Sequence, residues 1–299
     1  GGILSPAVFL WTSFPRTQEF SRITYNDRAL QRIRKNLPIP PEPLFSCALL
    51  FLSMLMEPDP FCNPDKTLPT DCSSPSPTAP ISGDSFAAAL VRYGIQLPAD
   101  QSALLDRFAQ LLWDWNQKVN LTRHTDYEKF VGRDVLDALV FAEFLQQGEK
   151  VLDVGSGGGV PGALLAILRP DLRVCLSESI GKKARVAEEI IQKLGLKASV
   201  FHGRAEQILA KEQFNTLTIR AVAPLKELLK WFKPYWPQFD RMLVLKGPGW
   251  VQERGEARHY GLAHGLALRK LKTYTIPSTG AESVLLQLCP EDRMLDQKQ

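Results

Sequence analysis

Apolar residues recur at helical spacing along three segments in the middle of the chain. Residues 86–93, 101–116 and 135–145 place their apolar side chains mainly three and four positions apart. This spacing gathers the side chains on one face of a helix, so each segment predicts an amphipathic helix with one buried face. Together they predict a small helical layer that precedes the rest of the fold.

The hydrophobic pattern changes directly after these helices. Residues 151–154 are a short apolar run that leads into the glycine segment 155–159 and then into the apolar residues 162–168. Further apolar runs follow at residues 173–178 and 198–203. Strands that alternate with helices predict an α/β protein with a mostly parallel sheet. Glycines at the end of the first strand allow a tight turn and a close approach of the backbone to a ligand, so we expect a small-molecule cofactor there.

The residues around the glycines favour S-adenosylmethionine (SAM) over a dinucleotide. Asp153 precedes the first glycine by two positions, where its carboxylate can accept from the ammonium group of SAM, directly or through water. The third glycine of the dinucleotide pattern is missing, because Val160 occupies its position. Glu178 ends the second strand 23 positions after Gly155, close to the roughly 20 expected for a carboxylate that binds ribose hydroxyls. A glycine turn without a nucleotide is the alternative.

The N-terminal part of the chain differs from the rest. Residues 1–83 contain most of the prolines, and residues 58–80 show no periodicity, which predicts a disordered, low-complexity extension. Residues 44–56 are an apolar run, too short for a membrane span of about 20 residues. This run resembles a secretory signal, although no clear small-residue cleavage site follows it. Because the chain does not begin with methionine, a second hypothesis treats the extension as a reading-frame artefact, with Met54 or Met56 as the true start.

Length, charge and cysteine content narrow the class of protein. The chain has 299 residues, 44% of them hydrophobic, which is enough for one or two domains with a substantial core. A net charge of +4 permits a polyanionic partner without requiring one, since only clustering of the charge is diagnostic. The five cysteines show no C-x-x-C spacing, so we expect no metal site and no disulfide framework, and a reducing, cytoplasmic location.

Seven short motifs between residues 112 and 247 resemble one protein family. In chain order the motifs are LWDWNQKVNLT (residues 112–122), GRDVLDAL (132–139), DVGSGGGVPG (153–162), SIGKK (179–183), RAE (204–206), IRA (219–221) and LKG (245–247). This combination resembles the RsmG family, also called glucose-inhibited division protein B. The resemblance covers roughly residues 84–290. It implies a SAM-dependent methyltransferase with a seven-stranded Rossmann-like fold that methylates N7 of one guanine in 16S ribosomal RNA, near the decoding site.

The resemblance also implies positions for cofactor and RNA. Together with the residues identified from the pattern, the candidate cofactor-binding residues are Asp153, Gly155, Gly157, Val160, Glu178, Ala205, Glu206 and Arg220. We expect Val160 to pack on the face of the adenine, and Ala205 and Glu206 to read its edge. The candidate RNA-binding residues are Arg123, Lys182, Lys183 and Lys246, with Arg133 and Arg220 as substrate-side candidates.

Several of these candidates have a plain structural alternative. Glu206 starts a helix, where a carboxylate stabilises the positive end of the dipole whatever the function. Arg220 can contact the SAM carboxylate or an RNA phosphate, or it can form only a surface ion pair. Residues 226–236 interleave lysines with aromatics, which is typical of an RNA-stacking surface or of a charged helix face over buried rings. His124 is a further RNA candidate, although a lone histidine in a loop is often merely exposed.

The chain departs from the family pattern near the expected site. Asp134 follows Arg133 where the family commonly has histidine, so an anion replaces a cation. Glu178 stands where aspartate is usual, and residues 281–283 read Ala-Glu-Ser where the family has Glu-Arg-His. If the missing histidines bind RNA, these changes affect the choice of target or the efficiency, and not SAM binding.

The expected reaction requires no general base. Guanine N7 carries an in-plane lone pair and no proton, so methyl transfer depends mainly on in-line alignment. Residues 220–224 lack the Asn-Pro-Pro-Tyr or Asp-Pro-Pro-Tyr run of exocyclic-amine methyltransferases, and no cysteine follows a proline, which disfavours cytosine C5 chemistry. Two alternatives stay open: a methyltransferase that acts on a small molecule or a protein, and a SAM- and RNA-binding protein without activity, suggested by Asp134.

Four segments follow from these patterns. We expect an extension at residues 1–83, a helical layer at 84–148, a SAM-binding domain at 149–290 and a tail at 291–299. The expected partner is 16S rRNA in the small ribosomal subunit. The protein is expected to act as a monomer and without a membrane.

Overall fold

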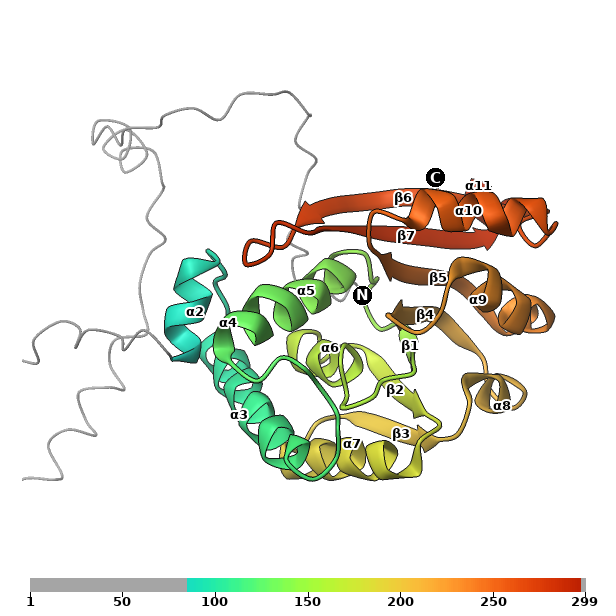
Figure 1. Cartoon of the computed structure of the whole chain (residues 1–299). Coiled ribbons are helices and arrows are strands. Elements are labelled where there is room, and N and C mark those ends of the chain that lie inside the picture. Colours follow the sequence, from blue (N-terminus) through green and yellow to red (C-terminus); the bar gives the residue numbers. More distant parts are fainter. Residues whose placement is uncertain (1–84, 297–299) are drawn as a thin grey trace, which may run out of the picture. The chain divides into compact units, whose positions relative to one another are not determined.

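Seven strands form one mixed sheet in the order β3-β2-β1-β4-β5-β7-β6 (Figure 1). The strands are β1 (Lys150–Val154), β2 (Arg173–Glu178), β3 (Ala198–His202), β4 (Phe214–Arg220), β5 (Phe239–Lys246), β6 (Leu266–Thr275) and β7 (Glu282–Pro290). Strands β1 to β5 are parallel, and β7 is antiparallel to its neighbours β5 and β6. The strand order reverses between β1 and β4. Ligands of open α/β sheets bind outside the carboxyl ends of the strands at such a point.

The computed structural model describes residues 85–296. The predictions for residues 1–83, namely the low-complexity extension, the signal-like run and the alternative start, lie outside the described residues. Within them, Cys175 and Cys289 are buried free thiols. No helix in this part of the chain combines the length and the apolar character needed to cross a membrane.

Helices cover both faces of the sheet (Figure 1). On one face lie α6 (Gly162–Leu168) and α7 (Gly181–Lys193), against which α3 (Ala99–Asn116) and α5 (Leu136–Glu143) pack. Two further helices, α2 (Phe86–Arg92) and α4 (Tyr127–Lys129), pack against each other and contribute to the same core. On the other face lie α8 (Ala205–Leu209), α9 (Leu225–Phe232) and α10 (Trp250–His259). Successive strand residues contribute to opposite cores, as Val151 and Leu152 do. The helical layer therefore shares one core with a face of the sheet.

The elements predicted from hydrophobic periodicity are confirmed. The three predicted helices correspond to α2, α3 and α5, and the strand, glycine and helix unit corresponds to β1, its following loop and α6. With the sheet order, this confirms the seven-stranded Rossmann-like α/β fold. Among the elements that were not predicted individually are a π-helical segment, Phe130–Val135, directly before α5, and α11 (Glu291–Asp296) within the expected tail. The segment boundaries at residues 83, 148 and 290 stay a prediction.

Aromatic packing holds the π-helical segment against α3. Phe108 and Leu112 of α3 have no exposed surface, and burying a side chain of this size stabilises the fold by about 1.5–3 kcal/mol. Phe130 stacks on Phe108 with ring centroids 6.2 Å apart, and Trp113 meets Phe130 edge-on at 6.2 Å. Segments with π-helical geometry occur frequently at functional sites. This one carries two charged side chains of the site described next.

Candidate active site

The glycine segment after β1 is hydrogen-bonded to the end of β2. The backbone N–H groups of Gly155 and Ser156 both donate to the carbonyl of Ser177, at 2.9 and 3.1 Å. Gly155 and Gly157 have φ values of +68° and +58°, which residues with a side chain rarely adopt. A Cβ built at Gly157 would meet no atom within 4 Å. At Gly157 the segment therefore presents bare backbone with open space in front of it.

Asp153 holds this segment from inside the protein. Its carboxylate is fully buried and accepts hydrogen bonds from the Thr218 hydroxyl and the Gly162 N–H, both at 3.0 Å. Burial raises the pKa of Asp153 to about 6, although these donors and the charge of Arg220 act in the opposite direction. Both carboxylate oxygens are thus engaged within the protein. The direct contact between Asp153 and the SAM ammonium group that the sequence suggested does not fit this arrangement.

Glu178 ends β2 and binds the same segment. One carboxylate oxygen accepts from the Gly157 N–H and the other accepts from the Ile180 N–H, each at 2.8 Å. A carboxylate has about four lone-pair positions, so two backbone donors leave room for two further donors. The arrangement is compatible with the predicted binding of both ribose hydroxyls.

Two cavities adjoin at Gly155. The first, the α8 cavity, has a volume of about 260 Å³ and is lined by the ends of β1 and β2 together with Ala205, Glu206 and Trp231. The second, the loop cavity, has a volume of about 380 Å³ and is lined by the rest of the glycine segment and by polar residues from three other parts of the chain. The residues that line the loop cavity include Arg123, His124, Arg133, Asp134, Val160 and Arg220.

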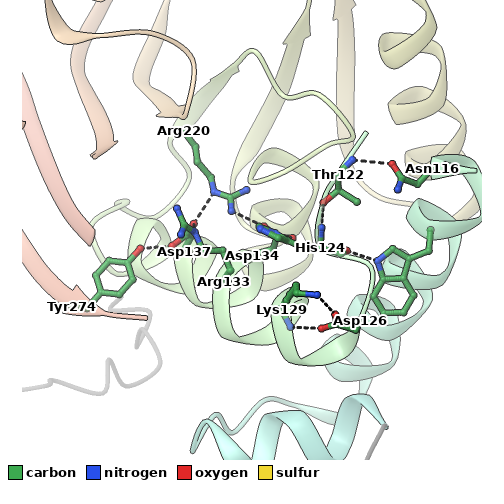
Figure 2. Close-up of polar contacts among 11 residues, drawn as sticks. Asn116, Thr122, His124, Asp126, Lys129, Arg133, Asp134, Asp137, Arg220 and Tyr274 are labelled. Atoms are coloured by element: carbon green, nitrogen blue, oxygen red, sulfur yellow. Dashed lines mark hydrogen bonds and ion pairs between the residues drawn. The ribbon is translucent and has the colours of Figure 1, made fainter. Parts of the chain in front are cut away.

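Arg220, at the end of β4, is held between two buried carboxylates (Figure 2). Its Nε lies 2.7 Å from Asp137 Oδ2 and its Nη2 lies 2.6 Å from Asp134 Oδ1. Burial by itself lowers the pKa of Arg220, but the charges of the two carboxylates outweigh it and raise the pKa above its ordinary value. Two of the guanidinium nitrogens are therefore committed to the protein. This buried pair of contacts corresponds to none of the roles predicted for Arg220, of which the surface ion pair comes nearest.

The same carboxylates bind two further side chains from distant parts of the chain (Figure 2). Nδ1 of His124 lies 2.9 Å from both oxygens of Asp134. The Tyr274 hydroxyl, on β6, donates to Asp137. Burial and the charge of Asp137 raise the pKa of Tyr274 well above its usual range. Asp134, which the sequence placed as an unexplained anion, is thus matched by a cation and an imidazole.

A third cavity, the outer cavity, has a volume of about 780 Å³ and lies between the helical layer and the turn after β6. His124 and Arg133 line both the outer cavity and the loop cavity. Nε of Arg133 is buried, makes no hydrogen bond, and lies 3.5 Å from Asp137 Oδ2. Within residues 85–293, no group of three or more His, Cys, Asp or Glu side chains is placed to hold a metal ion.

Comparison with known proteins identifies the family. The family model for rRNA small subunit methyltransferase G matches residues 101–279. The ribosomal RNA small subunit methyltransferase G of Rhodopirellula baltica is 47% identical over 197 residues, which cover 66% of this chain and 85% of that protein. The chain belongs to the rRNA small subunit methyltransferase G family. Its relatives of the same name in Chromobacterium violaceum and Pseudomonas aeruginosa are 33% and 36% identical, over 67% and 55% of this chain and 93% and 77% of their own lengths.

This is the RsmG family that the sequence motifs resemble, so the predicted family is confirmed. Membership of rRNA small subunit methyltransferase G also confirms the predicted class of enzyme, a methyltransferase that uses SAM as its cofactor. The individual site residues expected from the resemblance are now placed by the structure.

The structure divides the family-derived cofactor candidates between the two cavities. Ala205 and Glu206 line the α8 cavity, Val160 lines the loop cavity, and Gly155 borders both. The two cavities meet at Gly155, with Val160 in one and Ala205 and Glu206 in the other, so the contact of one adenine ring with all three residues stays a prediction. Glu206 is already paired, since its carboxylate lies 3.0 Å from Arg204 Nη2.

The RNA-binding residues that the family resemblance implies differ in exposure: one is largely buried and three are exposed or partly exposed. Lys246 is largely buried, and its ammonium group donates to the carbonyl of Ala223 at 2.6 Å and lies 2.8 Å from Glu253 Oε2. It holds the segment after β4 instead of presenting a free charge, and its contact with RNA stays a prediction. Lys182 is exposed at the start of α7, Lys183 follows it, and Arg123 is exposed beside the loop cavity.

Two members of the polar cluster have no counterpart in the sequence-based set. Asp137 was noted only as part of a family motif, and Tyr274 lies 137 positions further along the chain. No local pattern marks Tyr274. Asp134 was the one residue of the sequence that indicated such a cluster. It is an acid where the family carries histidine, and a buried acid requires partners.

Proposed function

We propose that this protein transfers the methyl group of SAM to N7 of a guanine in the 16S rRNA of the small ribosomal subunit. The observation that carries the proposal is the junction of two cavities at Gly155 in a chain of the methyltransferase G family. One cavity can hold the nucleoside part of a cofactor, and the other can admit a base. Their shared border is where a methyl group would pass between them.

The residues around Gly155 fit SAM. Gly157 leaves the backbone bare at the border of the loop cavity, where a side chain would occupy the space of a ligand. At Gly155 the positive φ and the side chain of Val222, 3.1 Å from a built Cβ, disfavour any larger residue. Glu178 has lone pairs to spare for ribose hydroxyls, and Trp231 offers an aromatic wall to the α8 cavity. When bound, SAM supplies an electrophilic methyl group on a sulfonium centre. The protein itself has to bind and orient SAM and the base, and to exclude water from them.

The charges around the loop cavity agree with a reaction that moves no proton. Asp134 is held by Arg220 and His124, and Asp137 is held by Arg220 and Tyr274, so neither carboxylate is free to act as a base. Guanine N7 reacts through its lone pair and has no proton to lose. Alignment of the two reactants can then supply most of the acceleration.

We expect three exposed or partly exposed cations to contact the proposed substrate. Arg123 borders the loop cavity, and Lys182 and Lys183 lie at the start of α7, near the carboxyl end of β2. Phosphate contacts by such side chains position RNA without reading its sequence. We propose that the protein works as a monomer in the cytoplasm, which light scattering and cell fractionation would test.

Incubation with tritiated SAM and unmodified small ribosomal subunits tests the proposal. We expect label at one guanine, mapped by chain cleavage at N7-methylguanine. Binding of SAM is measured separately by calorimetry. SAM binding without labelled RNA would refute the assignment of the substrate, and label on protein or small molecules would favour the alternative class of methyltransferase.

A further inference from the structure

We propose that His124 reads the Watson–Crick edge of the substrate guanine and thereby selects guanine over adenine. In this assignment Nε2 of His124 accepts a hydrogen bond from N1–H or from the N2 amine of the base. The inference rests on the proposed function and names the residue that supplies its base specificity.

The ring of His124 is held in one orientation. Nδ1 lies 2.9 Å from both oxygens of Asp134, which is itself buried and tied to Arg220 (Figure 2). The backbone of His124 is fixed as well, because its N–H donates to the Thr122 hydroxyl at 3.0 Å and its carbonyl accepts from Trp113 Nε1 at 2.7 Å. A residue whose ring nitrogen and backbone are both held needs little ordering when a ligand binds.

The contact with Asp134 decides which nitrogen of the ring faces outward as an acceptor. A carboxylate accepts, so Nδ1 donates to it, and in the uncharged ring the lone pair is then on Nε2. The negative charge of Asp134 is matched by Arg220 at 2.6 Å, and that of Asp137 by Arg220 and Arg133. Nε2 makes no hydrogen bond within the described part of the chain.

The position of His124 suits the edge of a purine opposite N7. The imidazole side of a purine, which carries N7, lies across the base from N1 and N2. If N7 points toward the glycine segment, the opposite edge points toward the far border of the loop cavity. His124 and Arg133 lie there, because both also line the outer cavity. The side chain of His124 is 28% exposed, so it is accessible from the cavities.

Guanine and adenine both offer N7 as a nucleophile, so N7 alone cannot distinguish them. They differ at the Watson–Crick edge, where guanine presents N1–H and the N2 amine as donors and adenine presents N1 as an acceptor. An acceptor such as Nε2 pairs with guanine and faces the lone pair of adenine. Sites built around such a hydrogen bond discriminate strongly, because the wrong base leaves a polar group unpaired.

A double-mutant cycle that combines His124 variants with base analogues of the substrate guanine tests this contact. The guanine mapped with the wild-type protein is replaced in reconstituted subunits by inosine, which lacks the N2 amine, or by 2-aminopurine, which lacks N1–H. We expect wild-type kcat/KM to fall roughly tenfold for one of the two analogues, as for the loss of one hydrogen bond. His124→Ala is expected to lose roughly tenfold on guanine and to show no further loss on that analogue, because the two changes remove the same bond.

Controls separate this contact from a structural role. His264 is exposed and lines none of the three cavities, so His264→Ala is expected to behave as wild type. SAM affinity and melting temperature are measured for each variant, and His124→Phe replaces the ring without its lone pair if His124→Ala does not fold.

Full discrimination against both analogues in the His124 variants would overturn the inference and assign the ring to a phosphate or to the fold. Unchanged kcat/KM on guanine in those variants would overturn it too. If wild-type protein labels no guanine, the proposed function fails and the inference falls with it, a result distinct from either of these.

Discussion

Replacement of Asp153 by asparagine tests how burial sets the charge of the carboxylate behind the glycine segment. Asp153 has no exposed surface, and burial raises its pKa from 3.8 to about 6. A rise of this size corresponds to about 3 kcal/mol of unfavourable free energy for the charged carboxylate at neutral pH. An asparagine carries no charge, and its amide can still accept from the Gly162 N–H and donate to the Thr218 hydroxyl.

The sign of the effect follows from the two pKa values. Between about pH 4 and pH 6 the folded state binds more protons at Asp153 than the unfolded state, so this residue lowers stability as the pH rises. The contribution is zero below pH 4 and complete above pH 6. We therefore expect the free energy of unfolding of Asp153→Asn, relative to wild type, to increase by about 3 kcal/mol between pH 4 and pH 7.

Urea unfolding followed by circular dichroism at pH 4, 5, 6 and 7 measures this difference. Asp171→Asn is the control, because Arg169 lowers the pKa of the partly exposed Asp171 to about 2, and its difference from wild type is expected to be flat from pH 5 to pH 7. A flat difference for Asp153→Asn would refute the burial argument. SAM affinity by calorimetry is expected to stay unchanged, since neither oxygen of Asp153 lines a cavity.

Three further changes test the ion cluster, the glycine segment and the RNA surface. Arg220→Leu leaves two buried carboxylates without their cation, so urea unfolding is expected to show a loss of about 3–5 kcal/mol. Gly162→Ala places a Cβ 2.7 Å from Asp153 Oδ2, so we expect weaker SAM binding and a loss of about 1–3 kcal/mol in the same assay. Joint replacement of Lys182 and Lys183 by alanine is expected to raise KM for small subunits and to reduce the slope of log KM against log salt by about 1.5.

Each change has a matched control elsewhere in the fold. Lys193→Ala breaks an exposed ion pair with Glu189 and should lower stability by less than about 0.5 kcal/mol. Gly247→Ala meets no atom within 4 Å and should leave stability and SAM binding unchanged. Lys211→Ala removes an exposed lysine away from α7 and should leave the salt slope unchanged. A variant of the first set that behaves like its control would contradict the corresponding argument.

Local sequence patterns predicted most elements of the fold. Apolar spacing located α2, α3 and α5, and the change from helical spacing to a short apolar run located β1 and its glycine segment. These features depend on residues that are close in sequence, because helix and strand periods bring them onto one face. The motifs then identified the family, and with it the sheet and the cofactor.

Tertiary structure decided what the polar residues do. Arg220 meets Asp137 and Asp134 across 83 and 86 positions of sequence, and Tyr274 joins them from β6. Lys246 and Asp153 have charges that suggested ligand contacts, yet both are engaged within the protein.

The elements could be predicted from the sequence and the roles of the charged residues could not, because the two depend on residues at different separations along the chain. Periodicity of apolar residues reports burial along one element, and burial is repeated at every turn or every second residue. The role of a charged side chain depends instead on the few atoms within hydrogen-bond distance of it, which come from elements remote in the chain. The sequence alone determined most of the elements, the fold and the family of this protein. The pairing of its buried charges, which also orients His124, was decided by the packing of the helical layer, β4 and β6 against one another.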